Sequence, residues 1–466
     1  MNQKIKIRTR QWLPVLLLLI FGMQIQVVTA QNEESSAASN GAAGLPSSSS
    51  GSKKLTLSGA VDLALKQNLD IQIANIETAS KQQDRVITRS NLLPHAGFDA
   101  NEAITRYNTK AQLGIQPSMI PHEVGPYQSI HLGAIFSAPI FDATLIRQYQ
   151  ASGHRLLASR ADEQTVREET VLLAVSEYMA HLRALARITA AQSRVELADR
   201  LAHQAQDLLT NGVASKIDVS RAQVRLKEEQ QHLVDDQRDA ETTLYALKRI
   251  LNIPDSEQIE FVEQQELFST PSLGISDPLS TALRQRPELH SLSESIKAAE
   301  STHKAALAES LPSLTFDGRW NEQGQTLRTV TPGYEYRFGM RVRIFTGGRL
   351  SAERKGTALA EQRTQRKLAQ ERNLITEQVR DGQAELEAAQ HQVELGRQEV
   401  QLANEEVSLS RGRFQSGVTD NIEVTTAQDS LARANDAEIQ ALFRYNIARA
   451  QLARAIGAVE QTYTHP

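Results

Sequence analysis

Small and bulky apolar residues recur every seven positions in the second half of the chain. A bulky row begins at position 379 and consists of Val379, Leu386, Val393, Val400, Val407 and Phe414. A second row, three positions along, contains only small residues: Gly382, Ala389, Gly396, Ala403 and Ser410. A seven-residue repeat predicts coiled-coil packing. The small row lets a neighbouring helix approach closely, while the bulky row fills the adjacent groove.

The first half carries the same pattern in a row of alanines, Ala184, Ala191, Ala198 and Ala205. The helix that returns from each long helix has its own row: Val219, Leu226, Leu233, Ala240 and Leu247 in the first half, and Ala427, Ala434, Ala441, Ala448 and Ala455 in the second. Because positions 140–253 and 333–465 contain no proline, we predict uninterrupted helices over about 147–209 and 349–414. Each would be roughly 95 Å long at about 1.5 Å per residue, which exceeds a compact domain.

Other segments alternate with period two, which predicts β-strands. One face of residues 334–344 is apolar: Tyr334, Tyr336, Phe338, Met340, Val342 and Ile344. The opposite face carries Glu335, Arg337, Gly339, Arg341 and Arg343. Similar alternation, weaker in the first segment, predicts strands over about 95–108, 127–141, 313–323 and 333–345.

The whole plan occurs twice. ALKQNLDI at 64–71 matches ALRQRPEL at 282–289, and Leu93–Pro94 matches Leu311–Pro312. The turn NGVASKIDVSRAQ at 211–223 matches SGVTDNIEVTTAQ at 416–428. We therefore predict a first repeat over 55–251, an inter-repeat connection over 252–280, a second repeat over 281–457 and a tail over 458–466.

The N-terminus has the three-part plan of a cleaved secretory signal, which we place at 1–30. A basic stretch ends at Arg10, an apolar run follows, and small residues end at Ala30. An uncleaved anchor is the alternative, although the run is shorter than the roughly 20 residues that a membrane span needs. Residues 31–54 are small and polar, and we expect a disordered arm there.

An exported chain with such strands can occupy an outer membrane, because the strands match the roughly 9–11 residues that a transmembrane strand requires. A sheet in lipid must close, since an open edge leaves backbone groups unsatisfied. Four strands are fewer than the usual minimum of about eight, so the membrane interpretation requires several copies of the chain. An ordinary exposed sheet would also alternate.

Composition narrows the classes of function. The chain has 466 residues, a net charge of -4 and no cysteine. The charge gives no reason to expect a nucleic-acid partner, and the lack of cysteine excludes disulfides, thiolate metal sites and a cysteine nucleophile. We find no GxxxxGK[ST], GxGxxG, GxSxG or HExxH motif, and the histidines are scattered. We expect no enzyme, no cofactor and no metal site.

From Leu55 to Gly457 the chain resembles the TolC-like outer-membrane factor family. The resemblance rests on the duplicated plan, on both repeated motifs, on the paired turns and on IFTGGR before the second long helix. It implies a mainly α fold with membrane β-strands, in which a homotrimer forms a twelve-stranded barrel continued by a periplasmic α-helical barrel. It also implies a passive exit duct for tripartite efflux or type I secretion, located in the outer membrane. Its partners would be outer-membrane lipid, a hexameric periplasmic adaptor and an inner-membrane pump of RND or ABC type.

The resemblance also assigns roles to the two turns. They match the family's periplasmic tips, which would contact the adaptor through Asn211, Gly212, Val213, Ser416, Gly417 and Val418. Alternatively, the glycines only turn the chain, since glycine tolerates a positive φ. Glu423 matches an acidic position that narrows the family's tunnel, and Asp420 lies one turn away. Three symmetry-related carboxylates would attract cations; a solvated surface carboxylate is the alternative. We expect Asp218, the counterpart of Glu423, to pack against neighbouring helices.

If the apolar face of residues 334–344 contacts lipid, the opposite face would line the barrel lumen with Arg337, Arg341 and Arg343. These arginines would either favour the passage of anions or simply be solvated charges. A periplasmic coiled-coil adaptor and a structural envelope protein remain the rival functions. An adaptor usually has a single helical hairpin within a lipoyl-like β domain, whereas this chain repeats the hairpin and the strands. The sequence does not identify the cargo, and a proton-driven multidrug or metal pump is the favoured partner.

Overall fold

The structure is a computed structural model. It describes residues 53–109, 111, 121–212, 215–262, 267–416, 418–419 and 421–464. All helices and strands below belong to one unit, Gly51–Pro466. The predicted signal peptide and nearly all of the predicted arm lie outside the described residues.

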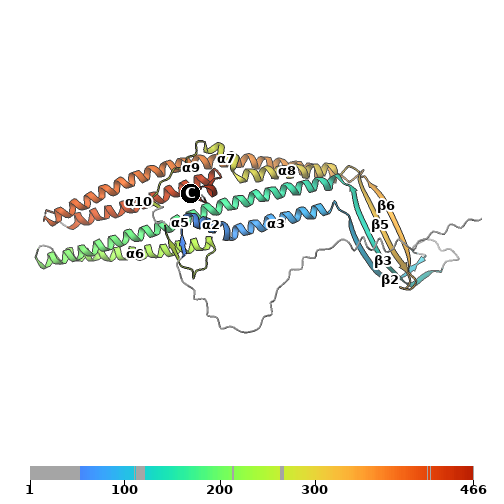
Figure 1. The fold of residues 1–466 in the computed structure, drawn as a ribbon, viewed down its shortest axis with the longest axis horizontal. Coiled ribbons are helices and arrows are strands. Elements are labelled where there is room, and N and C mark those ends of the chain that lie inside the picture. Colours follow the sequence, from blue (N-terminus) through green and yellow to red (C-terminus); the bar gives the residue numbers. More distant parts are fainter. Residues whose placement is uncertain are drawn as a thin grey trace, which may run out of the picture. The chain divides into compact units, whose positions relative to one another are not determined.

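The chain builds the same series of elements twice, and the second half adds one short helix at its end (Figure 1). The first half contains β1 (Lys53–Leu55), α2 (Leu57–Gln67), α3 (Leu69–Ser90), β2 (His95–Asn108), β3 (Glu123–Phe141), α5 (Ala143–Thr210) and α6 (Lys216–Leu251). The second half contains β4 (Ile259–Phe261), α7 (Pro278–Gln285), α8 (Pro287–Ala308), β5 (Ser313–Gly324), β6 (Thr331–Arg341), α9 (Arg349–Gln415), α10 (Asn421–Ala455) and α11 (Val459–Thr464).

The two longest helices run nearly as the proline-free stretches predict. α5 has 68 residues and α9 has 67. Asp142 begins α5, because its carboxylate accepts hydrogen bonds from the backbone of Thr144 and Leu145. α5 packs along α6, and α9 packs along α10, so each half ends in a helical hairpin (Figure 1).

The seven-residue rows lie where these helices meet. Four alanines of α5 and all five alanines of the α10 row are buried: Ala184, Ala191, Ala198 and Ala205, then Ala427, Ala434, Ala441, Ala448 and Ala455. A Cβ on Gly396 would lie 3.3 Å from the Cα of Glu438 on α10. The small row therefore sets how closely α9 and α10 approach.

The main core joins both halves. Its largest fully buried side chains include Tyr178 of α5, Leu247 of α6 and Leu442 of α10. The two-stranded parallel sheet of β1 and β4 lies against this core, where the rings of Phe261 and Tyr178 are 5.5 Å apart. Segments that are distant in the sequence, including β1 and β4, thus meet in one apolar cluster, and their apolar side chains are removed from water.

The four longer strands form one antiparallel sheet in the order β2-β3-β5-β6. One register row runs across it through His95, Ser137, Asp317 and Arg337. The next row carries Ala96, Phe136, Gly318 and Tyr336. Because neighbouring residues of a strand point to opposite faces, these rows mark a polar face and an apolar face.

Several element boundaries differ from the sequence expectation. Lys53 and Lys54, which we assigned to the arm, pair with β4 through β1. The predicted tail contains α11, whose Val459 and Tyr463 are buried. α7 begins at Pro278, slightly before the predicted second repeat. These short elements are stabilised by contacts with distant segments, which local sequence patterns do not reveal.

β6 ends at Arg341 rather than near 345. Alternation of apolar and polar residues continues to Ile344, but Gly347 and Gly348 then adopt φ of 59° and 87° and lead the chain into α9. Ile344 and Phe345 are 94% and 90% exposed within the chain. The alternation of apolar and polar residues therefore continues past the last paired residue. β6 stops at Arg341 because its partner strand β5 begins opposite, at Ser313, and offers no residue with which to pair beyond that point.

Candidate functional site

The first hairpin turns through Asn211 and Gly212. The backbone N–H of Asn211 donates to the carbonyl of Asp207 at 3.1 Å, and Gly212 has φ of 73°. A side chain would be strained at that φ, so glycine has a local reason to be here. Both residues are exposed. Val213, the third predicted residue of this tip, lies outside the described residues.

The return helix of the first tip begins with a reciprocal cap. Ser215 caps α6, and its backbone N–H and hydroxyl donate to the Asp218 carboxylate at 3.0 and 2.5 Å. These bonds lower the pKa of Asp218 below its usual range. Asp218 is half-buried, and the partner that the described hydrogen bonds give its carboxylate is Ser215 rather than a residue of another helix. The reason is that its carboxylate satisfies the first backbone groups of its own helix.

The second hairpin turns differently. The Ser416 hydroxyl donates to the carbonyl of Gly412 at 2.8 Å, and the Val418 N–H donates to the carbonyl of Arg413 at 3.0 Å. The Val418 side chain is 68% exposed, which leaves an apolar group in solvent at the tip. Gly417 and Asp420 lie outside the described residues.

Glu423, the gate candidate, is held by groups on both sides of this turn. It accepts a hydrogen bond from the Thr419 hydroxyl, and its carboxylate lies 3.3 Å from Nε of Arg413. The side chain is 38% exposed. Within one chain, Glu423 is therefore an ion-paired carboxylate in the first turn of α10, where the helix dipole also favours a negative charge.

An ion-pair network joins the two hairpins, and the sequence analysis did not identify it. Arg194 of α5 reaches Glu229 of α6 at 3.0 Å and Asp436 of α10 at 3.5 Å. Arg225 of α6 pairs with Glu229 at 2.7 Å and also with Asp429 of α10. Glu229 is only 3% exposed. Because its charge is removed from water, it depends on these arginines for stabilisation.

A signal for this network is present in the sequence. Residues of one charge lie seven positions apart on each helix, in the same period as the apolar rows: Arg187 and Arg194, Glu229 and Asp236, Asp429 and Asp436. Asp236 is buried, and burial raises its pKa, while Arg187 and Arg194 oppose that shift. Charges in heptad register therefore mark a helix interface rather than a solvated face.

The polar face of the four-stranded sheet contains two of the three predicted lumen residues. Arg337 lies in register with Asp317, and Arg341 lies in register with Ser313. Arg337 pairs with Glu335 at 2.5 Å, and the Ser137 hydroxyl donates to Asp317 at 2.8 Å. The arginines on this face thus lie among acidic and hydroxyl groups.

The opposite face of the sheet is an exposed aromatic surface. Phe316 lies 4.7 Å from Phe338 and 5.9 Å from Phe136, measured between ring centroids. Phe338 and Tyr334 are 78% and 77% exposed. It costs free energy to leave several neighbouring aromatic rings in water, so this face requires an apolar environment.

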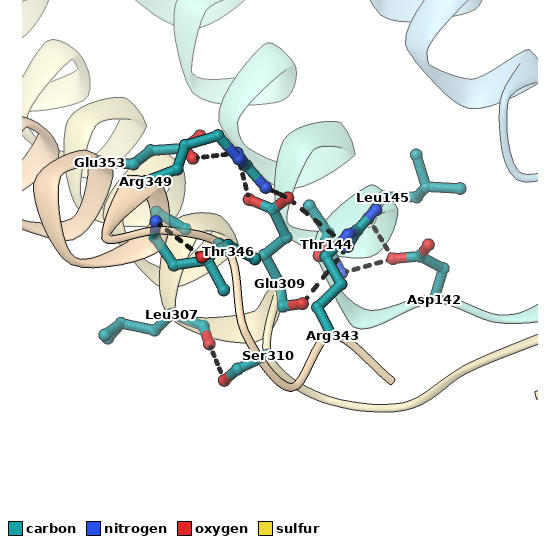
Figure 2. Close-up of polar contacts among 12 residues, drawn as sticks. Asp142, Thr144, Leu145, Leu307, Glu309, Ser310, Arg343, Thr346, Arg349 and Glu353 are labelled. Carbon is teal, nitrogen blue, oxygen red and sulfur yellow. Dashed lines mark hydrogen bonds and ion pairs between the residues drawn. The ribbon is translucent and has the colours of Figure 1, made fainter. Parts of the chain in front are cut away.

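Arg343 does not join the polar face. It lies beyond β6 and approaches the carboxylate of Glu309 at 3.5 Å and the Glu309 carbonyl at 3.3 Å. Figure 2 shows this junction between strands and helices, where Arg349 at the start of α9 also binds Glu309, at 2.5 Å, and Glu353 at 2.7 Å. Hydrogen bonding from Arg349 lowers the pKa of Glu309. Within one chain, Arg343 therefore helps to fix the path from β6 into α9 through Glu309.

A buried acid lies where α5 meets the end of the chain. Glu168 is 4% exposed, and its pKa is raised to about 7, chiefly because burial disfavours the charged form. Arg454 and the backbone of Val459 oppose that shift, while Glu460 and Glu288 add to it. Arg454 itself binds Glu288 at 2.5 Å. This cluster attaches α11 and α8 to α5.

The described chain leaves two kinds of surface without a partner. The outer edges of β2 and β6 pair with no other strand among the described residues. Along α9, leucines seven positions apart are 64%, 65% and 70% exposed: Leu395, Leu402 and Leu409. α6 exposes Ile217 and Val224 at the same spacing. Unpaired edges and apolar stripes are typical of surfaces that another chain covers.

Within the described ranges, no group of acidic, histidine or cysteine side chains is arranged to hold a metal ion. In the same part of the chain, no helix combines the length and apolarity needed to cross a membrane.

Comparison with known proteins agrees with this architecture. Residues 60–252 and 279–458 match the family model described as "Outer membrane efflux protein". The match divides at the connection between the repeats, so each repeat matches the model separately. No curated protein sequence matches the chain.

Solved structures share the fold at low sequence identity. The Campylobacter jejuni CmeC outer membrane channel superposes with a TM-score of 0.76 at 20% identity, over 86% of this chain and 86% of that one. The open state of the Neisseria gonorrhoeae MtrE outer membrane channel gives 0.74 at 19% identity, over 88% and 91%. The Vibrio cholerae outer membrane protein VceC gives 0.73 at 17% identity, over 86% and 96%.

Proposed function

Because this chain belongs to the outer membrane efflux protein family, we propose that it is the exit duct of a tripartite efflux or type I secretion system. Members of the family are passive channels of the outer membrane that extend into the periplasm, and they are not enzymes. In our proposal three copies of the chain form one continuous pore, and an inner-membrane pump performs the work of transport.

The open four-stranded sheet is the observation that carries the proposal. β2 and β6 form its two edges, and the antiparallel order makes them run in opposite directions. β6 of one copy can therefore extend the sheet onto β2 of the next as another antiparallel pair. Three copies give twelve strands, which satisfies the edge groups and exceeds the usual minimum of about eight.

The two faces of the sheet support closure into a barrel in lipid. The exposed rings around Phe316 and Phe338 suit the outer surface, and the row through Asp317 and Arg337 suits an aqueous lumen. In the helices, the exposed leucines of α9 and the apolar residues of α6 provide complementary stripes for adjacent copies. Twelve long helices, four from each copy, would continue the pore.

The paired tips support an adaptor partner. Each chain has two similar turns, so a trimer presents six, which matches a hexameric periplasmic adaptor. The described groups available for that contact are Asn211, Gly212, Ser416 and Val418, all of them exposed. The pump behind the adaptor would be of RND or ABC type, with a multidrug or metal efflux pump favoured.

The test is assembly and conductance of the purified protein. We expect the mature chain to migrate as a heat-stable trimer in the outer-membrane fraction and to form pores in planar lipid bilayers. A Leu402→Glu, Leu409→Glu double variant should lose both the trimer and the pores, because charges would enter the surface between copies. Gln401→Glu, an exposed polar site on the same helix, is the matched control.

A water-soluble monomer that binds neither detergent nor bilayer would rule out the duct. A charged double variant that assembles and conducts like the wild type would show that the α9 stripe does not lie between copies.

A further inference from the structure

A pocket opens between the two helical hairpins of a single chain. Its volume is about 520 Å³, within the roughly 300–1,000 Å³ of sites that hold drug-sized molecules. Most of its lining comes from α5 and α10, and α6 and Phe268 contribute the rest. Half of the lining residues are aliphatic, among them Leu185, Ala186, Ala190, Leu197, Leu431 and Ala432.

Every charged group that lines the pocket already has a partner. Arg194 and Arg225 are paired with Glu229 and with the aspartates of α10. Glu438 lies 3.9 Å from Nε of Arg397. A charged ligand would find no free counter-ion here and would lose its hydration, so the lining favours a neutral molecule.

One polar group of the lining is unsatisfied. Gln428 is 9% exposed, and its Nε2 has no hydrogen-bond partner among the described residues. A buried amide N–H without an acceptor is destabilising, and a ligand acceptor at this wall would satisfy it. The apolar lining and the unpaired donor together define the ligand chemistry.

We propose that this pocket binds a neutral, amphipathic small molecule of drug size that carries a hydrogen-bond acceptor directed at Gln428. The occupant contacts α5 and α10 at once, so it lies between the two hairpins of the chain. The site is complete within one copy and does not depend on the proposed role in export.

The probe is 6-propionyl-2-(dimethylamino)naphthalene, a neutral fluorophore whose ketone is an acceptor and whose emission shifts to the blue in apolar surroundings. It is titrated into the full-length assembled protein held in amphipol, with empty amphipol subtracted. We expect saturable, blue-shifted binding. Ala432→Phe fills the pocket and should weaken binding at least tenfold. Ala437→Phe, exposed on the same helix and outside the lining, should bind the probe like the wild type.

Gln428→Leu keeps the size of the side chain and removes the donor. We expect about a fivefold loss of affinity, since one hydrogen bond contributes roughly 1 kcal/mol. Unchanged binding in this variant would overturn the requirement for an acceptor. Absence of saturable binding in the wild type, or wild-type affinity in Ala432→Phe, would overturn the site. Ala186→Phe fills the pocket from α5 and replaces Ala432→Phe if that variant does not fold.

A protein occupant is tested in cells with p-benzoyl-phenylalanine placed at Ala190, which lines the pocket. We expect no protein to be captured. Capture of a second copy of the chain or of an adaptor would overturn the small-molecule assignment. Conductance of each variant is measured in parallel, so a failure of the duct proposal is distinguished from a failure of the pocket.

Discussion

The two hairpin tips share a sequence motif but differ in their electrostatics. In the first tip, Asp218 accepts hydrogen bonds from Ser215 and completes the cap of its own helix. At the matching position of the second tip, Glu423 reaches back across the turn to Arg413 of α9. The residue that aligns with Arg413 in the first half is Leu208, which cannot pair with a carboxylate. Duplication has thus kept the sequence motif of the turn, while the charges now connect different groups.

The same divergence appears along the hairpins. Ala191 of α5 aligns with Gly396 of α9, and both are buried, Gly396 against Glu438 of the returning helix. Glu168 of α5 is buried and ionisable, whereas the aligned Asn373 of α9 is neutral and exposed. The second hairpin therefore has a glycine where its two helices meet, and the first hairpin has a buried ionisable group at the position where the second has an exposed asparagine. Three experiments separate these differences, beginning with the largest expected effect.

Gly396→Leu should strongly destabilise the second hairpin. A Cβ would meet the Cα of Glu438 at 3.3 Å, and the remaining side-chain atoms would force α10 away from α9. Overpacking of this kind costs roughly 1–3 kcal/mol. We expect a lower melting temperature by circular dichroism and fewer trimers.

Gly412→Leu is the matched control, because a Cβ there has no atom within 4 Å outside its own helix. It should leave stability unchanged or raise it, since glycine is a poor helix former. Equal melting temperatures for the two leucine variants would contradict the close approach at Gly396.

Glu168→Gln should remove a pH dependence that belongs to the first hairpin. The folded-state pKa of about 7 exceeds the ordinary value of 4.5. The stabilisation is therefore fully present below pH 4.5 and is lost as pH rises through about 7. The wild type should lose stability over that window relative to the glutamine variant, as measured by melting temperature against pH.

Asp162→Asn, an exposed site on the same helix, serves as the control and should follow the wild type. If the Glu168→Gln and wild-type curves run parallel between pH 4.5 and 7, Glu168 does not titrate in the way that its burial implies.

Glu423→Ala tests the tips directly and has the smallest expected effect. Removing the carboxylate frees Arg413 and lowers the negative charge at the proposed constriction. We expect a few-fold rise in closed-state conductance of trimers in planar bilayers, together with weaker block by divalent cations. Asp218→Ala should change conductance less, because Asp218 only caps its own helix.

Unchanged conductance and unchanged divalent block in Glu423→Ala would leave this residue as a surface ion pair. An equal response in Asp218→Ala would show that the two tips act alike despite their different hydrogen bonds.

The sequence predicted the regular parts of the molecule well. The proline-free gaps predicted α5 and α9, and the alternation of apolar and polar residues predicted β2 and β5 closely. Both signals are local: a helix without proline keeps its hydrogen bonds, and a half-buried strand alternates regardless of its partner. The family was predicted from the duplicated motifs, and the match of each repeat to the family model confirms it.

The site was predicted less completely. Glycine at the first turn could be anticipated from its conformational freedom, and Gly212 has the expected positive φ. The role of Arg343 could not be anticipated from the sequence. Its partner Glu309 lies before β5, and the two residues come close only after β5 and β6 pair. Arg194, Glu229 and Asp436 lie on three different helices, so heptad spacing marks each residue but not its partners.

By itself, the amino-acid sequence determined which segments are helix and strand, that the plan is duplicated and which residues are small enough for close packing. These properties depend on residues a few positions apart. The tertiary structure alone decided which carboxylate meets which arginine, where β6 ends, and that α5, α6 and α10 enclose a pocket beside Gln428. Those outcomes depend on contacts between residues far apart in the chain, which form only when the two halves pack together.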